Sequence, residues 1–172
     1  MKKHLLRSLV VFASCVAALC QTAHWKNYQY AADGIAFAAP SNPVFKTQTN
    51  QTAVGPVESH NYMIDLGGNS AVVVAVADFG NRKRTESKHD ILQGAKNGSL
   101  KSANGKLVSE KDITLDGNPG LEYDMESQAF HAHTRVFLVN SRLVQLISLA
   151  PTGKPLSAST AQIFNSLKLL KQ

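Results

Sequence analysis

Residues 70–79, Ser-Ala-Val-Val-Val-Ala-Val-Ala-Asp-Phe, decide the fold of this chain. The valines in this stretch are β-branched and favour a strand. Polar residues do not alternate with them, so the pattern marks neither face of the strand for contact with water. We therefore predict a central strand that is buried on both faces, in a sheet covered by helices on each side.

Two segments carry helical patterns that can provide this cover. One runs from Glu86 to Ala103, although Gly94 and Gly98 each cost a helix about 1 kcal/mol relative to alanine. The other runs from Ser157 to about Leu167, with Ser157 as the expected N-cap. Each segment follows a predicted strand along the chain and can therefore pack on the sheet.

The remaining elements are predicted strands joined by short connections. Short connections imply antiparallel neighbours. We expect five strands, a helix, four strands and a second helix, which is an α+β fold arranged as a three-layer α/β/α sandwich with one mostly antiparallel central sheet. Beyond residues 70–79, the predicted strands are a hairpin around Asp33-Gly34, residues 44–52, Val57–Leu66, Lys106–Leu115, Leu121–Glu126, Ala129–Val139 and Arg142–Ala150.

The N-terminal segment, residues 1–20, has the pattern of a secretory signal peptide. Basic residues precede a short apolar stretch, and Ala18-Leu19-Cys20 offers a signal-peptidase site. We expect cleavage near Cys20, with Ala18 and Ala23 as alternatives. Residues 21–172 then form one globular domain that is secreted or periplasmic.

Both cysteines, Cys15 and Cys20, lie in this leader. The mature domain is therefore expected to use neither disulfides nor thiol catalysis. An alternative is that residues 12–15, Phe-Ala-Ser-Cys, act as a lipobox, so that an acylated Cys15 anchors the protein to a membrane.

The charge balance argues against nucleic acid as a partner. The chain has 18 Lys and Arg against 12 Asp and Glu, and three of the cations belong to the leader, which leaves a mature charge of +3. The sequence contains no G-x-S-x-G, H-E-x-x-H, Walker or G-x-G-x-x-G motif. We therefore expect a protein that is not an enzyme and has no cofactor, with an unrecognised hydrolase as an alternative.

Four stretches of the sequence share a family pattern: WKNYQYAADGIAFAAPSNP at 25–43, KLVSEKDITLDGNPGLEYDME at 106–126, RVFLVNSRLVQL at 135–146 and IFNSLKLL at 163–170. Together they resemble the PsbP-like family and its bacterial secreted relatives. The resemblance covers most of the mature chain and implies an α/β/α sandwich with a non-catalytic role, as an accessory subunit or a binding partner of another protein. Chloroplast members of the family assist photosystem II, but this chain has a short bacterial-type leader and that role is not carried over.

One strand pair offers a candidate metal site. If Ser127-Gln128 forms a two-residue turn, Asp124 lies opposite His131 and Glu122 lies opposite His133. All four side chains then share one face and could bind zinc, copper or manganese. The alternative is that these histidines and carboxylates pair across the strands at a solvated end of the sheet, or serve as a pH sensor or partner contact.

A second candidate site is the cationic run Arg82-Lys83-Arg84, which would suit a phosphate, an anionic lipid head group or an acidic partner. The alternative is a solvated loop. The leading functional hypothesis is a secreted or periplasmic, non-enzymatic accessory protein that binds another protein. The main alternative is a metal- or small-ligand-binding protein.

Overall fold

A computed structural model describes residues 24–52, 55–80 and 86–171. The predicted signal peptide with its cleavage site near Cys20, the lipobox at Cys15 and the cationic run Arg82-Lys83-Arg84 all lie outside these residues.

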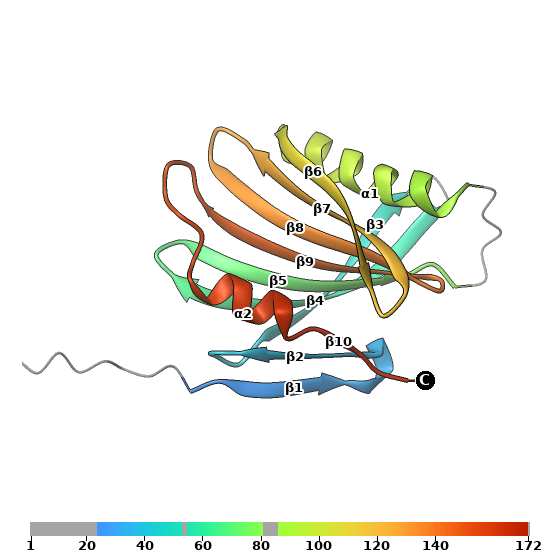
Figure 1. The fold of residues 1–172 in the computed structure, drawn as a ribbon, viewed down its shortest axis with the longest axis horizontal. Helices are drawn as coiled ribbons and strands as arrows, with labels where there is room; N and C mark the ends of the chain where they lie inside the picture. The colour runs from blue at the N-terminus through green and yellow to red at the C-terminus, as the bar shows by residue number, and fades with distance from the viewer. Residues whose placement is uncertain (1–23, 53–54, 81–85, 172) are drawn as a thin grey trace, which may run out of the picture.

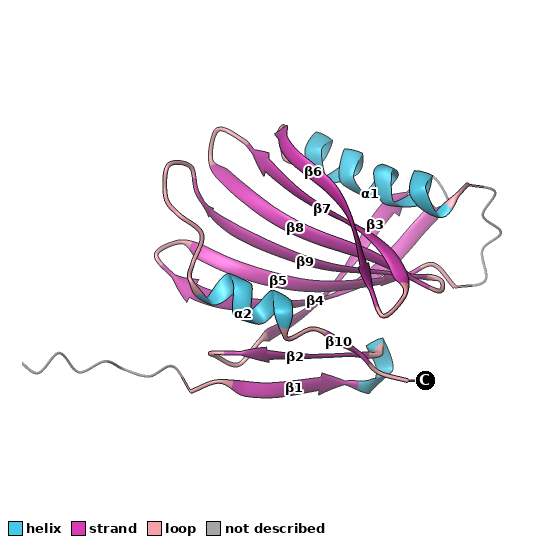
Figure 2. Ribbon diagram, in the orientation of Figure 1, coloured by secondary structure: helices cyan, strands magenta, loops and turns pink. Residues whose placement is uncertain are grey.

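The observed elements follow the predicted order of five strands, a helix, four strands and a helix, with one further short strand at the end (Figures 1 and 2). The elements are β1 (Lys26–Tyr30), a 3-10 turn (Ala31–Asp33), β2 (Ile35–Ala39), β3 (Val44–Thr52), β4 (Gly55–Gly67), β5 (Ser70–Asp78), α1 (Lys88–Ser102), β6 (Lys106–Leu115), β7 (Asn118–Glu126), β8 (Phe130–Val139), β9 (Arg142–Pro151), α2 (Ser159–Asn165) and β10 (Lys168–Leu169).

The strands form two antiparallel sheets. The large sheet has seven strands in the order β3-β4-β5-β9-β8-β7-β6, which places β5 and β9 in its interior. The small sheet has the order β1-β2-β10, so the first hairpin pairs with the C-terminal strand and not with the large sheet. The α+β class and the mostly antiparallel sheet are confirmed. The small sheet was not predicted.

One face of the large sheet is sealed by the small sheet together with α2. Val72, Val74 and Val76 of β5 point to this face and are almost fully buried. They belong to the same apolar cluster as Phe37 of β2 and Phe164 of α2. In Figure 1 the small sheet and α2 lie together below the large sheet, and they form the lower layer of the sandwich.

The other face of the large sheet is only partly covered, which corrects the prediction that β5 is buried on both faces. Helix α1 packs on β7 and β8, whereas Val73, Ala75 and Ala77 of β5 are only half-buried. Seven strands about 4.8 Å apart span about 29 Å. One helix is about 10–12 Å wide with its side chains, so it covers two or three of them.

Both helix starts differ from the prediction. Helix α1 begins after Ser87, whose side chain accepts a hydrogen bond of 3.1 Å from the Asp90 N–H while the Asp90 carboxylate accepts one of 3.3 Å from the Ser87 N–H. This capping box fixes where α1 starts. Helix α2 begins one residue later than predicted, with Ala158 at the N-cap in place of Ser157.

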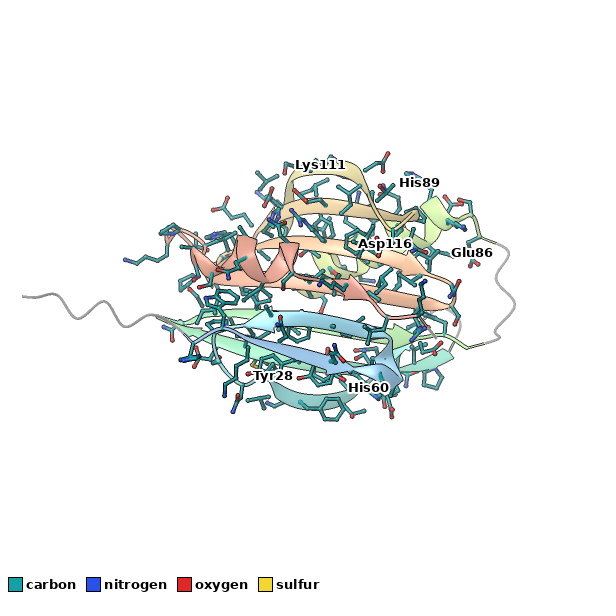
Figure 3. All side chains as sticks on the ribbon, turned by 60° about the horizontal axis from the view of Figure 1, so that its bottom comes forward. Tyr28, His60, Glu86, His89, Lys111 and Asp116 are labelled. Carbon is teal, nitrogen blue, oxygen red and sulfur yellow. The ribbon has the colours of Figure 1, made fainter. Side chains whose placement is uncertain are left out.

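The predicted tight turn at Asp33-Gly34 is a connection of four residues, because Tyr30 pairs with Ile35. Asp33 is buried and its carboxylate accepts a 2.7 Å hydrogen bond from Nδ1 of His60 and another from the hydroxyl of Tyr62, both on β4. Figure 3 shows His60 beside the end of the small sheet. A polar contact thus fixes the small sheet to the large one.

The packing in the interior of the large sheet can be tested by a substitution at Gly120. It lies opposite Phe137, and a Cβ added to it would stand 2.5 Å from both the Phe137 ring and the Val136 carbonyl oxygen. We expect Gly120→Ala to lower the free energy of unfolding by about 1–3 kcal/mol, because strand backbones must move apart. Urea titration measures this change.

The matched control is Gly94→Ala in α1, where an added Cβ meets nothing within 4 Å. This variant should raise the free energy of unfolding by about 0.5–1 kcal/mol, since alanine favours a helix over glycine. Equal stabilities for the two variants would contradict the described packing.

Candidate functional site

The predicted metal ligands lie on one face of the β7–β8 pair, but in a different register. The predicted pairs, Asp124 with His131 and Glu122 with His133, are wrong: Asp124 lies opposite His133, and Glu126 lies opposite His131. The turn lies one residue later than predicted, at Gln128-Ala129, because the Ser127 N–H donates a 2.8 Å hydrogen bond to the Phe130 carbonyl and the two residues face each other. The shift is an even number of residues, so the side chains keep their face.

The new register places Arg135 opposite Glu122. The Glu122 carboxylate accepts hydrogen bonds of 2.6 Å from Nε of Arg135 and 2.9 Å from Nζ of Lys111 on β6. Nε2 of His133 lies 3.7 Å from the same carboxylate. Glu122 therefore sits among three basic side chains.

Asp124 has its own two partners. Its carboxylate accepts hydrogen bonds of 2.8 Å from Nδ1 of His133 and 2.6 Å from the hydroxyl of Ser109 on β6. Phe164 of α2 covers this group from the other side, with its ring stacked 5.5 Å from the His133 ring and 5.5 Å from the Arg135 guanidinium.

The carboxylates of this network are held in their charged form. Burial alone would raise the pKa of Glu122, but the hydrogen bonds from Lys111 and Arg135 lower it below its usual value. Burial also opposes ionisation of Asp124, and its hydrogen bonds with Ser109 and His133 likewise lower the pKa of that carboxyl. Both groups thus act as ion-pair partners.

Metal binding at these residues stays a prediction, and the geometry favours the alternative of cross-strand ion pairs. Among the residues that the structure describes, no group of three or more His, Cys, Asp or Glu is arranged to hold a metal ion. A metal at Glu122 would have to displace Arg135 and Lys111. Sequence reasoning missed Lys111 and Phe164 because they come from other elements.

A larger feature lies on the opposite face of the large sheet, and we call it the α1 groove. It is an opening of about 930 Å³ between α1 and the part of the sheet that α1 leaves uncovered. Its floor follows β9, its wall is α1, and its ends are formed by the tip of β3 and by the start of β8. The residues that line it include Ile91, Gly94, Ala95, Gly98, Met125, Phe130, Leu143, Gln145, Ile147 and Leu149.

The wall of the α1 groove contains two glycines in the interior of a helix. A Cβ built on Gly94 or on Gly98 meets nothing within 4 Å, so close packing does not require glycine at either position. Each glycine costs the helix about 1 kcal/mol relative to alanine. The absence of side chains at these positions widens the groove.

The floor of the α1 groove carries one distinctive polar group. Gln145 lies between Ala75 on β5 and Val136 on β8, and it is half-buried. Within the described part of the chain, its side-chain amide makes no hydrogen bond to another residue. The amide is therefore available to a bound molecule. The sequence showed Gln145 only as a polar interruption of an apolar strand.

Apolar side chains are also exposed at the edge strand β6. Leu107 is 42% exposed and Val108 is 64% exposed, and they lie at an irregularity where the β6–β7 register shifts. A bulge of this kind blunts an edge against pairing with another strand. The exposed side chains still offer a small apolar contact surface.

The adjacent residues Ser59 and His60 do not form a nucleophile and base. The Ser59 hydroxyl donates to the Gln48 carbonyl at 3.2 Å and accepts from the Asn50 amide at 2.9 Å. His60 points to the opposite face of β4, toward Asp33. This agrees with the expectation that neighbours in a strand diverge.

Comparison with known proteins identifies the fold. No family model and no curated protein matches the sequence. Among solved structures, the chain is similar to the solution structure of cyanobacterial PsbP (CyanoP) from Synechocystis sp. PCC 6803, with a TM-score of 0.58 and 11% sequence identity. The similarity covers 92% of this chain and 98% of that one. The chain therefore has a PsbP-like fold, as the sequence motifs predicted. In the described ranges, no helix is long and apolar enough to cross a membrane.

The ion-paired network makes a pH-dependent contribution to stability. The folded pKa of Glu122 lies below its unfolded value, so its contribution is complete above the unfolded pKa and is lost as pH falls through the folded pKa. We expect Glu122→Gln to lower the free energy of unfolding by about 1–3 kcal/mol at pH 7. The loss should shrink between about pH 5 and pH 3.

Glu126→Gln is the matched control, since Glu126 lies on the same face of β7 but is exposed. Denaturant titrations at several pH values compare the two variants. An equal, pH-independent effect of both changes would show that Glu122 is not the centre of the network.

Proposed function

We propose that this chain is an exported, non-enzymatic accessory protein that binds another molecule through the α1 groove. The observation that carries the proposal is the groove itself, with about 930 Å³ of open space along a half-exposed apolar floor. A concave site with mostly apolar walls and a few polar groups is typical of binding sites. Large apolar openings are otherwise closed by packing in a domain of this size.

The chemistry of the groove supports binding over catalysis. Nucleophilic catalysis needs a nucleophile and a base within hydrogen-bond reach of each other. Among the described residues that line the groove there is no histidine, cysteine or lysine, and the hydroxyl of Ser99 donates to the backbone carbonyl of Ala95 at 3.1 Å. The groove thus offers surface and hydrogen bonds, and the hydrolase alternative finds no support in it.

A protein is the partner class that follows from the resemblance to PsbP-like accessory proteins. Such a partner would place an apolar group in the α1 groove, and Leu107 and Val108 at the β6 edge would extend the contact. The fold similarity alone does not identify a partner.

The predicted signal peptide at residues 1–20 supports export, so the proposed location is extracellular or periplasmic. Mass spectrometry of the mature N-terminus distinguishes cleavage near Cys20 from an acylated Cys15, and only acylation would add a membrane anchor.

The proposed binding role is tested by filling the groove from its wall. Gly98→Leu places a side chain in the open space beside α1. The variant should fold, because leucine is a better helix former than glycine. We expect immobilised wild type to recover specific molecules from an extract of the native envelope, and Gly98→Leu to recover about tenfold less of them. Quantitative mass spectrometry of proteins and of extracted small molecules provides the measurement.

The matched control is Asn97→Leu, which adds the same side chain at the neighbouring exposed position of α1, outside the groove. It should recover the same molecules as wild type. Identical recoveries for all three proteins, or recovery of nothing by wild type, would refute binding through the groove.

A further inference from the structure

The α1 groove is long and narrow enough to suit a linear molecule. Its floor runs along β9 from Leu143 to Leu149. Every second side chain of this stretch points into the groove, namely Leu143, Gln145, Ile147 and Leu149. Six residue steps of an extended strand span about 20 Å. The volume of about 930 Å³ lies in the range of about 300–1,000 Å³ that small-molecule sites occupy.

The two ends of the groove differ in polarity. At the end where Leu143 pairs with Ala77, the lining includes polar residues 50–52 of β3 and the carboxylates of Glu86 and Asp90 at the start of α1. Figure 3 shows Glu86 at this start. At the other end, Leu149 is joined by Phe130 and Met125. The groove therefore matches an amphipathic molecule.

The floor is unsuited to an extended peptide. Strand β9 is paired with β5 on one side and with β8 on the other, so its backbone N–H and C=O groups are used within the sheet. Along the middle of the described floor, Gln145 supplies the polar side chain. A buried peptide would leave most of its own amides without partners, at about 1–3 kcal/mol each. A hydrocarbon chain has no such groups.

The charged side chains at the polar end of the groove determine which head group a bound amphipathic molecule can have. The carboxylate of Asp90 is fixed in the capping box at the polar end, and Glu86 lies beside it in the lining. The ammonium group of Lys96 points elsewhere, since it pairs with Glu110 of β6 at 2.5 Å. The Asp90 carboxylate at this end disfavours an anionic head group and favours a neutral or cationic one.

We propose that the α1 groove binds a single-chain amphiphile, with its uncharged or cationic head near Asp90 and its hydrocarbon chain along Ile147 and Leu149 toward Phe130. This inference rests on the proposed binding role of the α1 groove and names an amphiphile as its occupant, in place of the apolar group of a protein partner. Gln145 provides the hydrogen bond that fixes a hydroxyl or amide near the head. Gly94 and Gly98 keep the path of the chain free of side chains.

The test uses the fluorescent apolar probe 1-N-phenylnaphthylamine with the purified mature protein. We expect the probe to brighten on wild type and on Asn97→Leu, and its Kd to rise at least about tenfold on Gly98→Leu. Dodecanol and dodecyltrimethylammonium, below their micelle concentrations, should displace the probe at concentrations about tenfold lower than dodecanoate does.

Several outcomes would overturn this inference. If wild type fails to brighten the probe, or if Gly98→Leu binds it as tightly as wild type does, the α1 groove is not a binding site for a hydrocarbon chain. If dodecanoate displaces the probe as efficiently as dodecanol does, the groove has no preference for an uncharged or cationic head group. If the probe does not bind while recovery of a protein from the envelope still depends on Gly98, the occupant is a protein segment, and the proposed function stands without this ligand class.

Discussion

The alternation of side chains along β5 is the constraint on which the rest of the molecule depends. Val72, Val74 and Val76 point to one face of the large sheet, and Val73, Ala75 and Ala77 point to the other. The first set is sealed by the small sheet and α2, and each valine buried in this way contributes about 1.5–3 kcal/mol. The second set faces the single helix α1, which is too narrow to cover it. The complete core and the open groove therefore arise from the two faces of one strand.

The sealed face depends on a polar contact as well as on apolar packing. The buried carboxylate of Asp33 is held by His60 and Tyr62, and the rings of Tyr30 and Tyr62 stack with centroids 3.8 Å apart. Burial raises the pKa of the Tyr62 hydroxyl, and the bond to Asp33 raises it further, so this group remains a donor. Because a buried carboxylate without partners is costly, this contact fixes the position of the small sheet.

The sequence predicted the elements well because they follow from local patterns. The unbroken valine run predicted the central position of β5, and Asn140-Ser141 predicted the two-residue β8–β9 turn, which the pairing of Val139 with Arg142 confirms. The same reasoning placed residues 135–146 as scaffold, and Leu138 and Leu143 are indeed buried on one face while Phe137 and Val144 are buried on the other.

The features that the sequence did not predict are set by geometry between distant segments. The register of β7 and β8 differs from the prediction because the turn lies at Gln128-Ala129 and not at Ser127-Gln128, and no residue pattern marks that choice. Strand β10 has only two residues, too few for a period to be recognised. An unbroken apolar strand predicts cover on both faces but does not reveal the width of the sheet relative to that of one helix. The α1 groove was therefore visible only in the fold.

The openness of the second face of the large sheet is tested most directly by the solvent exposure of individual methyl groups, measured by NMR with a soluble paramagnetic gadolinium chelate. An open groove should give strong broadening of the methyl signals of Ala77, Ile147 and Leu149, which line it, and little effect on those of Val72, Val74 and Leu146. Equal protection of both sets would contradict it, because the second face of the large sheet would then be closed.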